Sequence, residues 1–508
     1  EFKMKYLTIK IKLILFFIVI KILPLLGLAY IAYEGVLKLD NYLTKSTSFL
    51  FNQSKEIIIN TANASIEDSI KNLDKKSQES LEKVSYEIGN QVANFLYERD
   101  RDILFLSKLE LNENVLKNFY ESKKRDITIH GNYYYDEISN SYKTNEELKV
   151  EKRDKDVANL KDNEKEFNFV DPVKFQTKEI PIYKEISFLD LNGNEKYKVS
   201  SINENKTNVS IKKNTFASSE NYFDSLSKLK KDEIYVSDVI GEYVNTKVIG
   251  MFTKEKALKV GIEFEPQKYG YAGVENPLGK RFDGIVRFVT PVFNSNNEKI
   301  GYVSMALDHK HVREFTDTAN PTGKNVKQNI SDATLGNYAF MWDYEGKNIS
   351  HPRDYSIVGY DKNTGERAMP WLSADLAEKY YASNQNINEF LKSYPTFEEQ
   401  SLSKKPNMKQ LKELGNVGLD CRYLNFAPQC EGWMQLTQNG GYGSFIINWS
   451  GVWKLTTAAT IPYYTGQYAN TKRGFGFISI GASVDDFHAA ANETKRNVSE
   501  IFKNQTKS

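Results

Sequence analysis

The longest hydrophobic run of the sequence lies near its beginning. Residues 13–33 read LILFFIVIKILPLLGLAYIAY and contain a single charge, Lys21. At about 1.5 Å per residue, a helix of this length spans roughly 30 Å, the thickness of a bilayer's hydrocarbon core. Lysines are frequent in residues 1–12, so the positive-inside rule predicts a cytoplasmic N-terminus and an exported remainder. A cleaved signal peptide is the alternative, but the run is longer than a usual signal core and no small-x-small triplet follows closely.

Helical periodicity dominates the next segment. Between residues 37 and 109 there is no proline and only one glycine, Gly89. Apolar or small residues recur there at steps of three and four, which places them on one stripe of a helix. We therefore predict a long stalk helix over residues 37–120, packed along stacked domains or against a second copy as a coiled coil. Two ordinary helices that break near Asn60–Asn63 are the alternative.

The following residues, 121–167, are dense in charged and amide side chains, and we interpret them as a solvated loop. Strand-like alternation begins after them. Ile182–Asp190 and Glu195–Ser200 flank the dipeptide Asn192-Gly193, the strongest short-range signal for a β-hairpin. A second hairpin is predicted within residues 281–307. The pattern indicates one antiparallel sheet with helices inserted between its hairpins.

The same pattern then recurs. Residues 337–351 repeat the opening hairpin, and residues 444–482 contain three more expected strands. Two successive units of this kind form an internal repeat of architecture. We place the first module at residues 121–325 and the second at residues 326–483, with an insertion at residues 361–433. An amphipathic helix is expected over residues 484–508. The predicted fold class is α+β.

The composition and the absence of known motifs exclude several classes of function. The 508 residues carry 68 Lys+Arg against 66 Asp+Glu, a net charge of +2, so no electrostatic footprint for nucleic acid is present. Two cysteines and five scattered histidines exclude a disulfide scaffold and leave little material for a metal site. Among enzyme motifs, the sequence has no P-loop, no His-Glu-x-x-His and no Gly-x-Ser-x-Gly. We expect a protein that is not an enzyme, with no cofactor, no metal and no nucleic-acid partner.

The order of the parts resembles a known family. A membrane anchor, a long helix, two PAS-like sheets and an exit helix are similar to the double Cache (dCache) sensor domains of bacterial transmembrane receptors. A large-insert Cache subgroup is the nearest likeness. The stretches that carry the resemblance are Val92–Leu106, Ile234–Val239, Val289–Leu307, Tyr338–Pro352, Asp420–Trp433, Leu455–Gly466 and Arg473–His488.

The resemblance implies an extracytoplasmic sensor in the cell membrane. A small-molecule ligand would bind the first, membrane-distal module, and the chain would form a homodimer through its stalk and membrane helices. Residues 484–508 would lead to a second membrane segment and a cytoplasmic output, of chemotaxis or two-component type, beyond this sequence. Two other function classes stay open: a membrane-anchored periplasmic hydrolase, and a cell-surface binding module that uses the insertion for its contacts.

Five residues are candidates for the ligand pocket: Tyr235, Asp238, Tyr243, Arg287 and Asp308. In amino-acid-binding dCache sensors an Asp holds the ligand's ammonium group, and Asp308 is the residue here that resembles it. The Arg-x-Trp-Tyr cluster of those sensors is absent from residues 246–265, and each candidate also has a purely structural interpretation. Cys421 and Cys430, in an exported segment, are predicted to form a disulfide, with a redox-sensing role as the alternative.

Overall fold

The computed structural model describes residues 8–72, 75–129, 133–144, 176–250, 252–271, 276–319, 337–406, 415–449 and 452–483. The chain divides into two compact units, whose boundary falls after Asn72. The predicted exit helix, residues 484–508, lies outside the described residues.

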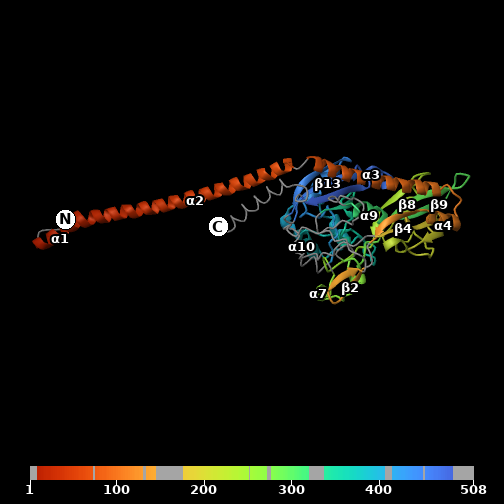
Figure 1. The fold of residues 1–508 in the computed structure, drawn as a ribbon, viewed down its shortest axis with the longest axis horizontal. Helices are drawn as coiled ribbons and strands as arrows, with labels where there is room; N and C mark the ends of the chain where they lie inside the picture. Colours follow the sequence, from red (N-terminus) through yellow and green to blue (C-terminus); the bar gives the residue numbers. More distant parts are fainter. Residues whose placement is uncertain are drawn as a thin grey trace. The chain divides into compact units, whose positions relative to one another are not determined.

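The described part of the first unit is helical (Figure 1). It contains α1 (Ile9–Phe17), the π-helical turn η2 (Ile18–Ile22) and α2 (Leu23–Asn72). The helical segment Ile9–Leu50 is long and apolar enough to cross a membrane: its most apolar window of 18 residues has a mean hydropathy of 2.5, and no residue of that window is buried. The predicted span at residues 13–33 falls within it.

The second unit contains two five-stranded antiparallel sheets, which we name the distal and the proximal sheet after the predicted modules, residues 121–325 and 326–483, in which they lie. The distal sheet is formed by β5 (Tyr183–Leu189), β6 (Glu195–Ser200), β7 (Tyr235–Gly241), β8 (Gly284–Phe293) and β9 (Lys299–Asp308), in the order β6-β5-β9-β8-β7. The proximal sheet is formed by β10 (Tyr338–Asp343), β11 (Asn348–Ser350), β12 (Tyr442–Trp449), β13 (Val452–Ile461) and β14 (Gly476–Ser483), in the order β11-β10-β14-β13-β12. If the strands of each sheet are numbered along the chain, both sheets have the same spatial order: second, first, fifth, fourth and third. The predicted α+β fold with two repeated antiparallel modules is confirmed.

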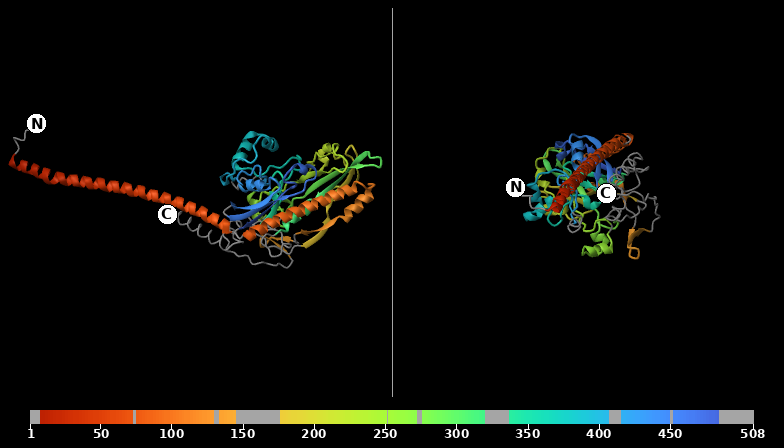
Figure 2. Two further views of the ribbon diagram at one scale, coloured as in Figure 1. Left: turned by 90° about the horizontal axis from the view of Figure 1, so that it is seen from above. Right: turned by 90° about the vertical axis from the view of Figure 1, so that its left-hand side faces the viewer.

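One helix packs against both sheets. Helix α3 (Lys75–Leu106) contacts β12, β13 and β14 of the proximal sheet and β8 and β9 of the distal one, and in Figure 2 it runs alongside their strands. Its buried side, including Leu96 and Ile103, joins a core with Val286, Phe288 and Ile478 from the two sheets.

The range predicted as one stalk helix, residues 37–120, contains more than one helix. α3 ends at Leu106, and a separate helix α4 (Glu113–Ser122) follows. Asn112 is the N-cap of α4, because its side chain accepts a hydrogen bond from the backbone N–H of Val115 (3.0 Å). This bond satisfies one of the backbone donors that have no partner within the helix at its start. The alternative break near Asn60–Asn63 does not occur, since these residues lie within α2.

The segment interpreted as a loop contains strands. β1 (Lys124–Ile129) pairs with β4 (Gln176–Pro181), and β2 (Tyr133–Asp136) pairs with β3 (Ser141–Thr144). The shorter helices are α6 (Phe223–Leu226), α7 (Lys254–Lys259), α8 (Pro266–Tyr269), α9 (Lys310–Asp317), α10 (Ala374–Ser383), α11 (Ile387–Lys392) and α13 (Gln429–Thr437). The 3-10 turns are η3 (Lys212–Asn214), η4 (Phe216–Ser218), η6 (Asp354–Ser356), η7 (Leu402–Lys404) and η8 (Gly466–Asn470).

Candidate functional site

Strand alternation decides which face of the distal sheet can hold a ligand. In β8, Val286 and Phe288 point into the core that α3 covers. Ile285, Arg287 and Val289 therefore point to the opposite face, because successive side chains of a strand alternate. Ile285 and Val289 belong to two separate apolar clusters on that face. Arg287 lies between them in the strand, a buried cation flanked by apolar contacts.

Arg287 is neutralised by side chains of its own module. Its Nε and Nη2 donate to the two carboxylate oxygens of Glu220, at 2.6 and 2.9 Å. Its Nη1 donates to Glu185 (3.4 Å) and to the hydroxyl of Ser304 (3.1 Å). Burial alone would lower the pKa of the guanidinium, but the attraction of Glu220, with contributions from Tyr222 and Glu185, holds this pKa well above its usual range.

Two further charges complete this group. The ammonium of Lys198 pairs with Glu185 (3.1 Å) and with Glu195 (3.0 Å), and all of these side chains are almost fully buried. We call Glu185, Glu195, Lys198, Glu220 and Arg287 the distal cluster. It contains three carboxylates and two cations, so its formal charge is 2 − 3 = −1 when all five are ionised.

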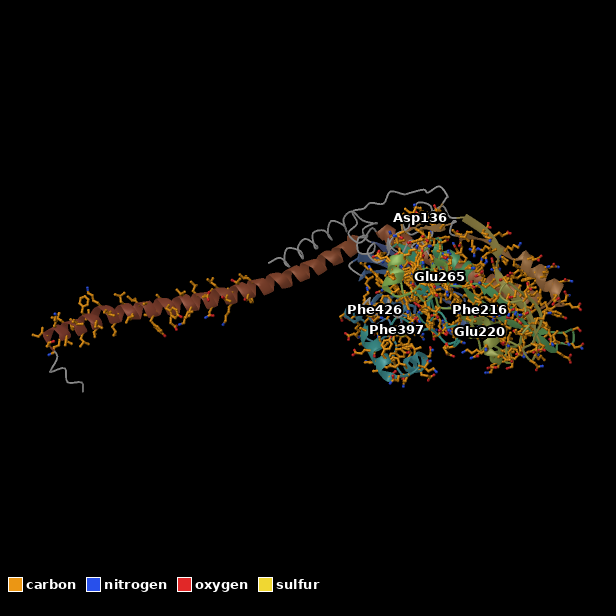
Figure 3. The ribbon with its side chains drawn as sticks, turned by 90° about the horizontal axis from the view of Figure 1, so that it is seen from below. Asp136, Phe216, Glu220, Glu265, Phe397 and Phe426 are labelled. Atoms are coloured by element: carbon orange, nitrogen blue, oxygen red, sulfur yellow. A yellow bond between two sulfur atoms is a disulfide. The ribbon has the colours of Figure 1, made fainter. Side chains whose placement is uncertain are left out.

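Aromatic rings border the distal cluster. The ring of Tyr222 lies beneath the guanidinium of Arg287, 5.1 Å from ring centre to cation, and stacks on Tyr235 at 5.9 Å. Burial raises the pKa of both phenols above their usual value, so both stay neutral. Glu220 reaches the cluster from the connection between β6 and β7, where it also accepts a bond from the N–H of Phe216 (3.2 Å). Figure 3 shows these two labelled residues close together.

Tyr235 and Arg287 thus come together, and the other three sequence candidates lie elsewhere. Asp238 faces the second module, where Arg367 (3.4 Å) and Gln467 (3.0 Å) donate to its carboxylate. The hydroxyl of Tyr243 donates to the carbonyl of Tyr355 (2.9 Å), again in the second module. Asp308 ends β9, and its carboxylate accepts from the N–H of Lys310 (3.0 Å) at the start of α9.

A continuous series of contacts leads from the distal cluster to α3. The backbone N–H of Arg287 donates to the hydroxyl of Ser237 (2.8 Å), which lies at an irregularity of β7. The carbonyl of Ser237 accepts from the phenol of Tyr468 in the second module (2.8 Å). The ring of Tyr468 lies 5.9 Å from that of Tyr463, whose phenol donates to Asp100 of α3 (2.7 Å).

Asp100 and its neighbour Asp102 hold α3 to different modules. Asp100 accepts from Tyr463 and from Thr465 (2.5 Å), both of the proximal module. Asp102 accepts from the phenol of Tyr183 in the distal sheet (2.5 Å). Side chains two positions apart on a helix point in different directions, so α3 carries one carboxylate for each sheet. Burial raises the pKa of Asp100 to about 6, although its hydrogen bonds from Thr465 and Tyr463 and the charge of Arg99 oppose that shift.

The predicted disulfide is present between Cys421 and Cys430. It lies in an aromatic cluster on the proximal sheet, beside Trp342 and Trp433. In the described part of the chain, no group of three or more His, Cys, Asp or Glu side chains could hold a metal ion.

Sequence reasoning identified Arg287 and missed the other four members of the distal cluster: Glu185, Glu195, Lys198 and Glu220. Glu185 lies in the alternating stretch Ile182–Asp190. Because charged residues are rarely buried without a partner, a charge inside a predicted core strand could have indicated a buried ion pair or a binding site. Glu220 lies in a loop, and nothing in its local sequence distinguishes it from other acidic loop residues. Only the fold brings it to Arg287, 67 positions away in sequence.

No protein-family model and no curated protein matches the sequence. Among solved structures, the chain is similar to the ligand-binding domain of the Pseudomonas fluorescens chemoreceptor CtaA in complex with L-leucine (8% identity, 82% of this chain and 100% of that one, TM-score 0.32). It is also similar to the periplasmic sensory domain of the Campylobacter jejuni chemoreceptor Tlp1 (10%, 81% and 95%, TM-score 0.31). A third is the ligand-binding domain of the Pseudomonas aeruginosa amino-acid chemoreceptor PctC in complex with GABA (8%, 80% and 98%, TM-score 0.30). Similarity at this level of identity and TM-score transfers neither a function nor a ligand to this chain.

Proposed function

We propose that this protein is the extracytoplasmic sensor region of a membrane-anchored receptor, in which the distal cluster binds a small molecule and α3 receives the resulting change. The observation that carries this proposal is the contact series from Arg287 through Ser237, Tyr468 and Tyr463 to Asp100. A buried polar site connected in this way to a helix that spans both modules is suited to signalling. A ligand shifts such a system only by its difference in affinity for the two arrangements.

The chemistry of the distal cluster favours a ligand with an amine. Its formal charge of −1 is buried, and a buried excess charge is costly until a counter-charge approaches. A primary ammonium group would supply that charge and would find carboxylate acceptors at Glu185 and Glu220, with Tyr222 and Tyr235 as aromatic walls. We therefore assign the ligand to small amines, including amino acids.

The disulfide supports the extracytoplasmic placement, because disulfides persist mainly in oxidising compartments. The apolar helix Ile9–Leu50 supports the membrane anchor. Signal output, and a homodimer through the stalk and membrane helices, belong to this proposal as well. They follow from the architecture of the transmembrane receptors that the sequence resembles.

The experiment is a thermal-shift screen of the full chain in lipid nanodiscs. The probes are the twenty L-amino acids, γ-aminobutyrate and putrescine, with succinate and acetate as acids that lack an amine. We expect at least one amine to raise the melting temperature and neither acid to do so. Glu185→Gln keeps the side chain's shape and removes the excess negative charge. It should weaken binding of that amine about tenfold, which corresponds to a loss of about 1.4 kcal/mol of binding free energy.

The control is Glu265→Gln, which removes a carboxylate that lies outside the distal cluster and pairs with Lys268. It should leave the amine's affinity unchanged. The ligand site in the distal cluster would be wrong if no amine shifted the melting temperature, or if both variants bound the amine equally.

Transmission to α3 has its own readout. Hydrogen exchange of the α3 amides should change when the amine binds. In Tyr468→Phe, which lacks the hydroxyl that contacts Ser237, the amine should still bind while the change in α3 is lost. Retention of the full exchange response in this variant would contradict the contact series.

A further inference from the structure

The proximal sheet also has a face turned away from α3. On β10, Ala339 and Met341 belong to the α3 core, whereas Phe340 and Trp342 belong to a separate cluster. Trp433 and Phe477 join this second cluster, with ring centres 5.4 and 6.2 Å from that of Trp342. We call Phe340, Trp342, Trp433 and Phe477 the tryptophan cluster.

Polar atoms without partners lie at the edge of the tryptophan cluster. Trp342 is paired with Asn348 across β10 and β11, next to an irregularity of the pairing. Ile349 points into the α3 core, so Asn348 points to the opposite face, on which Trp342 lies. Trp342 and Asn348 are 1% and 0% exposed. Within the described residues, the indole N–H of Trp342 and both the oxygen and the nitrogen of the Asn348 carboxamide have no hydrogen-bond partner.

The tryptophan cluster has a further buried indole N–H at its border. Trp371 packs against the tryptophan cluster and stacks on Phe426 with ring centres 4.9 Å apart. Its indole N–H is buried and also has no partner among the residues that the structure describes. By contrast, the indole of Trp433 donates to Thr456 (2.9 Å). Buried polar groups in native proteins are nearly always satisfied, so a group of them without partners calls for an explanation, and a bound ligand is one.

From this juxtaposition we infer that the proximal module has a second ligand site, formed by Trp342, Asn348 and the tryptophan cluster, for a small uncharged molecule with an apolar ring and an amide group. It is separate from the distal cluster and would form without any amine there. Apolar walls with a few polar groups are the usual lining of a small-molecule site.

The polar atoms define the ligand's chemistry. A carboxamide on the ligand would donate to the oxygen of Asn348 and accept from its nitrogen, which satisfies both atoms at once. The second lone pair of the ligand's carbonyl could accept from the indole N–H of Trp342. The apolar ring would stack among the aromatic side chains, an arrangement that adds to the energy of burial alone.

A carboxylate would fit less well. It has no proton for the oxygen of Asn348, and it would bring an unpaired charge against apolar walls. The neighbouring cation, Lys347, is already paired with Asp343 (3.5 Å) and with Glu345. The site therefore distinguishes an amide from the acid of the same shape.

The test uses matched pairs of probes on the full chain in nanodiscs: benzamide with benzoate, and nicotinamide with nicotinate. We expect at least one amide to quench tryptophan fluorescence and to raise the melting temperature, with at least tenfold weaker binding of its acid. Asn348→Leu, which has nearly the same shape and no polar atoms, should weaken amide binding at least tenfold. Trp342→Phe, which keeps a ring and loses the N–H, should weaken it severalfold.

Arg287→Gln is the control that separates this site from the distal cluster. It should leave amide binding unchanged, and Asn348→Leu should leave amine binding unchanged. Three results would overturn the proposal: no amide binds the unaltered chain, Asn348→Leu binds the amide as tightly as the unaltered chain does, or a crystal structure with benzamide shows an ordered water only on Asn348.

Discussion

At the scale of single residues, the most informative group is Asp100. Its pKa of about 6, against an ordinary value of 3.8, results mainly from burial. The folded protein therefore binds this proton more tightly than the unfolded chain does. The stabilisation from protonation is present below about pH 4 and is lost as the pH rises through about 6.

Asp100→Asn should remove this pH dependence. At about 1.36 kcal/mol per pKa unit, the difference in unfolding free energy between the variant and the unaltered protein should change by about 2.4 kcal/mol between pH 4 and pH 7.5, with the variant gaining relative stability as the pH rises. Denaturant unfolding at several pH values measures it. A constant difference over this range would contradict the burial of a titrating carboxylate.

Asp190→Asn is the matched control. Several hydrogen bonds, from Asn194, Lys196 and Asn192, overcome the effect of burial and lower the pKa of Asp190 to about 2. The ionised Asp190 stabilises the folded state above about pH 4, and this stabilisation is lost only as the pH falls towards 2. The difference in unfolding free energy between Asp190→Asn and the unaltered protein should therefore stay constant between pH 4 and pH 7.5.

At the scale of elements, the hairpins of the two five-stranded sheets were predictable from the sequence, whereas strands β1 to β3 and the pairing of distant segments were not. The hairpin around Asn192-Gly193 and the strands of both sheets follow from alternation and turn residues, which are local properties of the sequence. The pairing of β1 with β4 joins Lys124 to Pro181, and the bond of Arg287 to Glu220 crosses similarly distant segments. Such contacts depend on how the whole chain folds, and no local pattern encodes them.

The disulfide segment gives a prediction at the same scale. Cys421 and Cys430 are separated by 9 positions, and closing so short a loop reduces the entropy of the unfolded chain by an amount equivalent to about 2–3 kcal/mol. The double variant Cys421→Ser with Cys430→Ser should lose about that much unfolding free energy in denaturant experiments.

A reductant provides the control for this prediction. It should destabilise the unaltered protein by a similar amount and leave the double variant unchanged. Mass spectrometry of peptides prepared without reduction should show the two cysteines linked. Free thiols at both positions in protein isolated from cells would contradict an oxidising environment for this segment.

At the scale of the whole molecule, the sensor proposal requires the two units to lie in different surroundings. The apolar surface of Ile9–Leu50 is suited to lipid, whereas the second unit has the buried ion pairs and packed sheets of a water-soluble domain. The sensor proposal places the second unit outside the cell membrane, which is the orientation that the positive-inside rule predicts from the charges around residues 13–33. The positions of single cysteines relative to the membrane can test this orientation directly.

In the Cys421→Ser, Cys430→Ser background, a cysteine at Leu258, whose side chain is 81% exposed, should react with a membrane-impermeant maleimide in cells with a permeabilised outer envelope. A cysteine at Lys3 should react only after the cell membrane is lysed. The uncleaved chain should also resist extraction from membranes by alkaline carbonate. Equal labelling of both positions before lysis, or recovery of a shortened chain in the soluble fraction, would contradict the anchor. Since a receptor must connect its ligand site to the cytoplasm through that helix, the same result would exclude the sensor function proposed for the distal cluster.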